Sequence, residues 1–223
     1  MGLSPLWKLR ATAPADESVV APQPVAAPEV PASAAPAGDW DGLAAEVRDC
    51  RKCGLCAARR QAVLGVGDVA ADWLFVGEGP GAEEDQRGEP FVGQAGKLLD
   101  NMLAAIGLRR GDDVYIANAV KCRPPENRTP EAAELDACRP YLERQIALIR
   151  PRLIIALGRP AAQTLLGGEI KIAAARGRLH DRGGIPVVVT YHPAYLLRNL
   201  PDKAKAWEDL CFMRAAMRSL KAP

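Results

Sequence analysis

The feature that most constrains the fold is a short apolar run that leads straight into a glycine-rich polar loop and then a helical pattern. Residues 73–76 are all apolar, which is typical of a strand buried on both faces. From Ala95 to Ile106, apolar residues recur at helical spacing. Open α/β sheets bind ligands where a strand passes into a helix in this way. The loop at 77–94 is therefore the first candidate for a binding site, and its glycines would allow a close approach of backbone to ligand.

Three further apolar runs have the character of buried strands, at 114–118, 153–158 and 185–190. Helical segments alternate with these runs, which favours a parallel sheet covered on both faces. We therefore expect a three-layer α/β/α fold with a central four-stranded parallel sheet. Thr129 is expected to cap the helix after the second strand, and Pro140 to break that helix near Cys138.

Polar residues or glycines stand at the ends of all four predicted strands. Right-handed crossovers place the carboxyl ends of parallel strands at the same edge of a sheet. We therefore expect one site to contain Glu78, Asn118, Gly158 and His192.

Composition divides the chain into a tail, residues 1–38, and one folded domain, residues 39–223. Between Ala11 and Gly38 there are ten alanines and six prolines with almost no large apolar residue, which predicts disorder. Alternatively, Leu3, Leu6 and Trp7 form a short docking peptide. The net charge of +2 does not by itself indicate a nucleic-acid partner, so any DNA surface must be local.

Six cysteines without an export signal or a membrane-length apolar run predict metal or thiol chemistry in a reducing, cytoplasmic compartment. Five of them are candidates for four coordination positions: Cys50, Cys53, Cys56, Cys122 and Cys138. Cys211 lies in the last predicted helix and is most simply a core residue. Spacing alone favours a structural zinc site and an iron–sulfur cluster equally, because both use four thiolates.

Four motifs in order carry a resemblance to a known family over about residues 40 to 220. They are Gly-Glu-Gly-Pro-Gly at 77–81, Gly-Glu-Pro-Phe-Val-Gly at 88–93, Asn-Ala-Val-Lys-Cys-Arg-Pro-Pro at 118–125 and His-Pro-Ala-Tyr-Leu-Leu-Arg at 192–198. Together with the cysteines, they resemble the family-4, iron–sulfur uracil-DNA glycosylases. The resemblance implies a monofunctional DNA-repair hydrolase that releases uracil from DNA and leaves an abasic site. We also expect the protein to be a monomer.

The resemblance also implies a 4Fe–4S cluster held by Cys50, Cys53, Cys122 and Cys138, which leaves Cys56 spare. The cluster's expected role is architectural.

For the uracil pocket, the resemblance implies Glu78, Gly79 and Glu84, with Glu84 placed to crowd a thymine methyl. Glu78 is expected to be catalytic and, together with backbone groups, to place the attacking water. Gly79 occupies the position where better-known uracil glycosylases carry a water-activating Asp, so the general base is left open. Phe91 offers a ring for stacking or, alternatively, plugs the loop into the core.

Asn118 and His192 match the chemistry of uracil. The Asn118 amide can accept from N3–H and donate to O4, a pattern that cytosine reverses. His192 can donate to O2 as negative charge develops there. The alternatives are that Asn118 forms a turn and that His192 is structural.

The segment after His192 resembles the family's DNA-inserting loop, which implies DNA contacts by Leu196 and Arg198. Alternatively, the leucines there belong to the core. Two rival functions remain: a uracil-binding branch that captures DNA through a histidine in the loop after the second strand, and a non-enzymatic module that binds nucleic acid. The loop at 122–130 contains no histidine, which argues against the first rival.

Overall fold

The computed structural model describes residues 40–222. The predicted tail, residues 1–38, and its Leu3, Leu6 and Trp7 lie outside the described residues. The boundary of the folded domain therefore stays a prediction. No helix among residues 40–222 is both long and apolar enough to span a bilayer.

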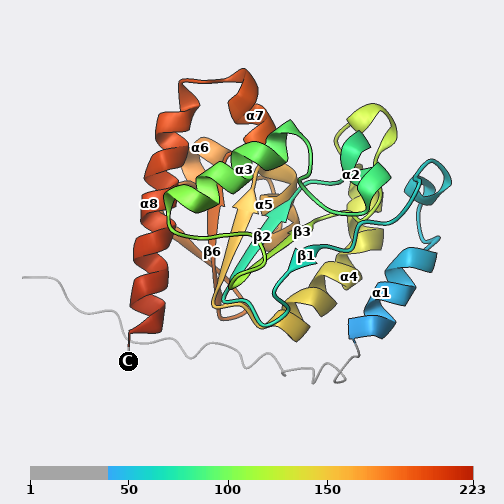
Figure 1. Cartoon of the computed structure of the whole chain (residues 1–223), viewed down its shortest axis with the longest axis horizontal. Helices are drawn as coiled ribbons and strands as arrows, with labels where there is room; N and C mark the ends of the chain where they lie inside the picture. Colours follow the sequence, from blue (N-terminus) through green and yellow to red (C-terminus); the bar gives the residue numbers. More distant parts are fainter. Residues whose placement is uncertain (1–39, 223) are drawn as a thin grey trace, which may run out of the picture. The chain divides into compact units, whose positions relative to one another are not determined.

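A six-stranded sheet with the order β1-β3-β2-β4-β6-β5 forms the centre of the described residues (Figure 1). Its four middle strands are parallel: β2 (Trp73–Gly77), β3 (Val114–Asn118), β4 (Leu153–Leu157) and β6 (Ile185–Thr190). The predicted parallel sheet is therefore confirmed, but it is flanked by two antiparallel edge strands, β1 (Val66–Gly67) and β5 (Leu179–Arg182). Neither edge strand has the continuous apolar run of a central strand, because β1 has two residues and β5 alternates exposed and half-buried side chains.

Helices cover both faces of the sheet, as predicted (Figure 1). One face packs against α3 (Gln94–Ala105) and α8 (Asp202–Lys221). The other packs against α4 (Ala132–Ile149), α5 (Arg159–Leu166) and α6 (Ile172–Ala175). Neighbouring strand residues face opposite layers, so that Phe75 packs toward α3 and α8 while Leu74 packs toward α4 and α5.

The long helix α4 differs from its prediction at two positions. Glu131, not Thr129, is its N-cap, and Pro140 lies inside a helix that continues to Ile149. Pro140 removes one backbone donor, so the carbonyl of Asp136 loses its helical partner. Both residues are exposed, so water can hydrate that carbonyl. Helix α1 (Trp40–Asp49) packs against α4 near Cys138.

Short helices lie in the segments that follow the strands. The glycine-rich loop contains α2 (Ala82–Arg87), and His192 is followed by α7 (Pro193–Arg198). Two 3₁₀ turns lie near the cysteines: η1 (Gly54–Ala57) contains Cys56, and η2 (Pro125–Asn127) follows Cys122. The parallel register pairs Gly77 with Asn118 and Leu157 with Thr190. The four strand ends therefore meet at one edge of the sheet, as expected.

Candidate functional site

A cleft of about 950 Å³ opens at the carboxyl edge of the sheet. Its lining includes seven of the residues that the sequence predicted to contact uracil or DNA: Glu78, Gly79, Glu84, Phe91, Asn118, His192 and Arg198. Leu196 is not among the lining residues. The cleft is much larger than one pyrimidine base, so it has room for the surrounding nucleotide.

Asn118 closes β3 with its side chain almost completely buried at the floor of the cleft. Its Oδ1 atom has no hydrogen-bond partner within residues 40–222. A buried acceptor without a partner costs about 1–3 kcal/mol. The arrangement requires glycine at position 77, because a Cβ there would lie 2.5 Å from Asn118 Oδ1 and 2.5 Å from Phe91 Cζ. The fold thus holds an unsatisfied acceptor against an aromatic ring.

His192 is the N-cap of α7, and its Nδ1 atom accepts a hydrogen bond of 3.1 Å from the backbone N–H of Ala194. The neutral ring therefore carries its proton on Nε2. Burial and, to a smaller extent, the charge of Arg198 lower the pKa of His192 to about 4, while Glu84 opposes the shift. At neutral pH, the ring is an uncharged donor that lines the cleft.

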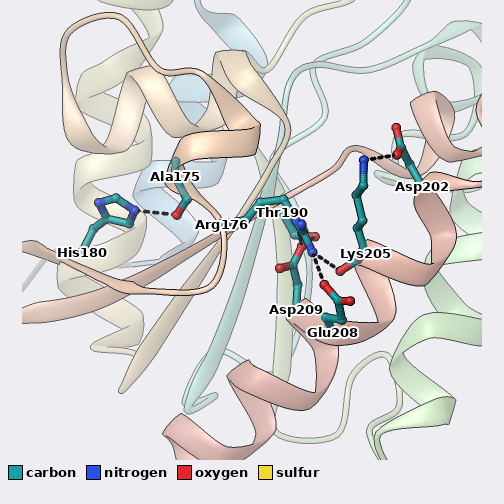
Figure 2. Close-up of polar contacts among 8 residues, drawn as sticks. All are labelled: Ala175, Arg176, His180, Thr190, Asp202, Lys205, Glu208 and Asp209. Carbon is teal, nitrogen blue, oxygen red and sulfur yellow. Dashed lines mark hydrogen bonds and ion pairs between the residues drawn. The ribbon is translucent and has the colours of Figure 1, made fainter.

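A polar cluster between α6, β6 and α8 holds the segment that carries His192. Figure 2 shows Thr190 and Arg176 meeting at Asp209 of α8, with distances of 2.6 Å from Thr190 Oγ1 and 2.8 Å from Arg176 Nε to Asp209 Oδ2. The Arg176 guanidinium also lies over the Tyr191 ring, 5.3 Å from its centroid. Arg176 is thus bound within the protein and does not face DNA phosphates as an unpaired cation.

Phe91 joins the core, which was one of the two alternatives that the sequence left open for it. Its side chain is 6% exposed and belongs to the apolar cluster between the sheet and α3. The ring lies 5.4 Å from the His192 ring, centroid to centroid, with 30° between the planes. The two rings therefore form one wall of the cleft.

Glu84 holds the glycine-rich loop together. One carboxylate oxygen accepts from the backbone N–H of Gly81 at 3.0 Å, and the other from Val92 at 2.9 Å and Gly93 at 3.0 Å. Three backbone donors therefore fix this carboxylate at the start of α2. Glu84 still lines the cleft, so bracing the loop is compatible with a contact to the base.

Glu78 and Gly79 form the lip of the cleft next to Thr129. Burial raises the pKa of the Glu78 carboxyl, while a hydrogen bond from Thr129 and the charge of Arg159 oppose that rise. A Cβ at position 79 would lie 2.7 Å from Val120 Cγ2, so glycine allows this close packing. Thr129 and Arg159 were not predicted as site residues, although Arg159 directly follows the third strand end, Gly158.

The two leucines of α7 have opposite environments, which corrects the assignment of Leu196 to DNA. Leu196 is 1% exposed and packs in the core beneath the cleft, whereas Leu197 is 41% exposed. The helical turn separates the directions of consecutive side chains by about 100°, and sequence could not decide which of them faces inward. Arg198 is exposed at the rim of the cleft.

A second, smaller cavity collects thiols from segments far apart in the chain. It is lined by Cys50, Cys53, Cys122 and Cys138, while Cys56 is not part of its lining. Among the described residues, no three Cys, His, Asp or Glu side chains are gathered as they would be around a single metal ion. Cys211 is half-buried in α8, so it is less enclosed than expected.

Basic groups surround this thiol cavity. Arg59 Nη1 donates to Cys122 Sγ at 2.8 Å, and the backbone N–H of Lys121 donates to Cys138 Sγ at 3.2 Å. Burial raises the pKa of the Cys122 thiol to about 11, although Arg59 opposes the rise. Burial likewise raises the pKa of Cys138. These thiols would ionise only with a strong positive partner, such as bound metal.

Comparisons with known proteins agree on one family. The model of the uracil DNA glycosylase superfamily matches residues 64–211. A type-4 uracil-DNA glycosylase of Archaeoglobus fulgidus is 47% identical over 70% of this chain and 82% of its own length. That of Saccharolobus solfataricus is 45% identical over 80% of this chain and 87% of its own. A type-5 uracil-DNA glycosylase of Pyrobaculum aerophilum is 35% identical over 58% of this chain and 64% of its own.

Proposed function

This chain belongs to the uracil DNA glycosylase superfamily, and we propose that it hydrolyses the N-glycosidic bond of uracil in DNA, releasing the free base and leaving an abasic site. The observation that carries the proposal is the buried Asn118 Oδ1 atom, which has no partner among the described residues. It lies in the same cleft as a neutral His192 ring whose free nitrogen is a donor.

These two side chains complement the edge of uracil. Asn118 Oδ1 accepts from N3–H while the Asn118 amide N–H₂ donates to O4, and His192 Nε2–H donates to O2. Cytosine has an acceptor at N3 and a donor at its exocyclic amine, so both Asn118 bonds would be lost. Phe91 packs against the flipped base, and the Glu84 carboxylate lies where a thymine methyl would crowd the loop. A base must leave the duplex to reach this cleft.

The chemistry separates a base that leaves with negative charge from a sugar that develops positive charge. As the bond between C1′ and N1 breaks, charge moves to uracil O2, where the uncharged His192 donor stabilises it. A water molecule oriented by Glu78 then attacks C1′, and its released proton passes to the departing base. The partly buried carboxylate of Glu78 also stabilises the positive sugar. Both catalytic groups, Glu78 and His192, lie on the cleft wall.

The proposal includes a 4Fe–4S cluster held by Cys50, Cys53, Cys122 and Cys138, the four thiols that line one cavity. The same four thiolates would suit a structural zinc ion or a 4Fe–4S cluster. The resemblance of the sequence motifs to the iron–sulfur glycosylases favours the cluster. When bound, the cluster supplies structural cross-linking between the segment before the sheet and the segments around β3 and α4.

Iron analysis tests the cofactor. Protein purified without oxygen should carry about four irons per chain and absorb broadly near ~400 nm. Stoichiometric zinc without iron would contradict this part of the proposal and leave the glycosylase activity as a separate question.

For DNA, the proposal places phosphates along the rim of the cleft, near Arg159, Lys171 and Arg198, which are exposed. The exposed Leu197 is placed to fill the space left by the flipped base. We further propose that the protein acts as a monomer in a reducing compartment, where its cysteines do not form disulfides. Gel filtration with light scattering tests the monomer.

The activity is tested with an oligonucleotide that carries one uracil opposite guanine. After incubation, alkali cleaves abasic sites, so strand scission at the uracil position reports hydrolysis. Thymine and cytosine oligonucleotides are the controls. A covalent protein–DNA adduct resistant to denaturation would favour the capturing branch, and binding without scission would favour a non-enzymatic module.

A further inference from the structure

The segment that carries Phe91 has an unfavourable backbone conformation. Phe91 has a φ of +56°, in the left-handed region that bulky residues rarely adopt. Such a conformation is unfavourable and persists only where the surroundings impose it. The contacts that impose it here therefore decide where the aromatic ring lies.

Hydrogen bonds to Glu84 and from Arg110 hold the backbone around Phe91 from two sides. Glu84 accepts from the backbone N–H groups of Val92 and Gly93, which follow the strained residue. Arg110 donates to the two carbonyls on the other side, from Nη1 to Pro90 O and from Nη2 to Phe91 O, both at 2.8 Å. The peptide groups around the ring are therefore bonded in both directions.

The guanidinium of Arg110 is itself oriented by α3. Asp100 Oδ1 accepts from Arg110 Nε at 3.1 Å and from Nη2 at 2.9 Å. The Phe91 carbonyl also lies against the first turn of α3, where a Cβ at position 96 would be 1.7 Å from Phe91 O. Gly96 thus makes room for the carbonyl, and the rigid fork of Arg110 fixes its direction.

We propose that Arg110 is a positioning residue for base excision, because it fixes the backbone of Phe91 and thereby the ring that packs against the flipped uracil. The inference rests on the proposed contact between Phe91 and the base. Arg110 reaches two carbonyls and one carboxylate together, which a lysine cannot do with one ammonium group. Nothing in its sequence context, a turn between α3 and β3, indicates this role.

The first test compares Arg110→Leu with a matched control, Arg109→Leu. Arg109 is the neighbouring arginine, and its side chain is 81% exposed in an ion pair with the exposed Asp112. Arg110→Leu should slow single-turnover excision by roughly 3–10-fold, the value of one aromatic contact. It should weaken inhibition by free uracil by a similar factor and leave the affinity for undamaged DNA unchanged. Arg109→Leu should match the parent in all three measurements.

A double-mutant cycle separates positioning from a general loss of structure. Phe91→Ala should slow excision by itself. If Arg110 acts through the ring, adding Arg110→Leu to Phe91→Ala should change the rate by less than about twofold. Equal losses from Arg110→Leu in both backgrounds, or a parent rate for the single variant, would overturn the inference.

The same cycle distinguishes this inference from the proposed function. If Phe91→Ala excised uracil at the parent rate, the stacking role of Phe91 would be wrong. If the parent released no uracil, the proposed function itself would be wrong. If Arg110→Leu is insoluble, Arg110→Gln and Arg110→Lys replace it in the cycle. Both side chains retain some hydrogen-bond donors, so we expect excision rates between that of the parent and that of Phe91→Ala. A larger loss in the Phe91→Ala background than in the parent would contradict the inference.

Discussion

The cleft and the thiol cavity lie on opposite ends of one short segment, since only three residues separate Asn118 from Cys122. The two regions differ in what each one needs from a bound partner. Of the four thiols that line the cavity, Cys122 and Cys138 are buried and burial raises the pKa of both, so they would ionise only with a bound positive partner. The cleft holds a strained Phe91 and an unpaired Asn118 oxygen on a complete sheet edge. We therefore expect the cavity to depend on its partner for folding, and the cleft to depend on its substrate only for the reaction.

The largest effect should come from Cys122→Ser, which removes one thiol of the cavity. A hydroxyl is a poor ligand for iron, so we expect loss of iron together with the yield of soluble protein. Cys56→Ser is the matched control, because Cys56 is not part of the cavity lining, and it should keep both. Iron content and soluble yield measure the result. A soluble, stable Cys122→Ser protein would show that the cavity does not depend on its partner.

In the cleft, removing a catalytic side chain should slow the reaction and leave the fold intact. His192→Ala should slow the chemical step by roughly 10²–10³-fold, because the donor to uracil O2 is lost. His192 also caps α7, so His192→Asn is the better variant, since asparagine can retain the cap while losing Nε2–H. Single-turnover rates should fall in both variants, and His192→Asn should keep the parent melting temperature. A parent rate for His192→Asn would refute the catalytic assignment.

Asn118→Asp changes the pattern of donors and leaves the shape of the cleft. Replacing the amide donor with an acceptor should slow uracil release by roughly 10–100-fold, since O4 is left facing an oxygen. A trace of cytosine release should appear, because the exocyclic amine of cytosine is a donor. Matched uracil and cytosine oligonucleotides decide this. Uracil release at the parent rate would mean that Asn118 only forms a turn.

Substitution of Leu196 should affect the stability of the fold, whereas substitution of Leu197 should affect the excision rate. Leu196→Ala removes a core side chain and should lower the free energy of unfolding by about 2–4 kcal/mol. Leu197→Ala should leave stability unchanged and slow excision from duplex DNA by roughly 3–10-fold more than from single-stranded DNA, which needs no wedge. Urea unfolding and paired kinetic assays measure the two outcomes. Equal losses on both substrates would exclude a wedge.

The smallest effect concerns pH. His192 has a pKa of about 4 in the folded protein and about 6.5 when unfolded. Between these values, the unfolded chain binds more protons, so this residue lowers the free energy of unfolding as pH falls from about 6.5 to 4. His192→Asn should therefore flatten the loss of stability in that window, as measured by urea unfolding at pH 7 and pH 5. If the free energy of unfolding of His192→Asn fell between pH 7 and pH 5 as steeply as that of the parent, the His192 ring would be exposed to water in the folded protein.

The sequence predicted the elements that are specified by a residue pattern within one segment of the chain. Each central strand is a continuous apolar run, and the residues at its carboxyl end follow from parallel topology, so Asn118 and His192 were brought together as expected. β5 could not be found in this way, because an edge strand with polar side chains has no such run.

Long-range contacts account for what was missed. Whether Leu196 or Leu197 faces inward depends on how α7 packs against the core, and Pro140 stays helical because water can hydrate the freed carbonyl. The hydrogen bonds of Arg110 to Pro90 and Phe91 join segments separated by a whole helix. No pattern in a single segment indicates such contacts.

The position of the four cavity cysteines in the chain also bears on the order of synthesis. All of them, from Cys50 to Cys138, precede β4 and β6, so they leave the ribosome before β6, the strand that leads to His192. At about 5–20 residues per second, translation of residues 139–192 takes roughly 3–11 s. During that interval, the thiols are present while the β6 edge of the cleft is missing. If the proposed cluster is inserted in that interval, it enters a nascent chain whose cleft is still incomplete.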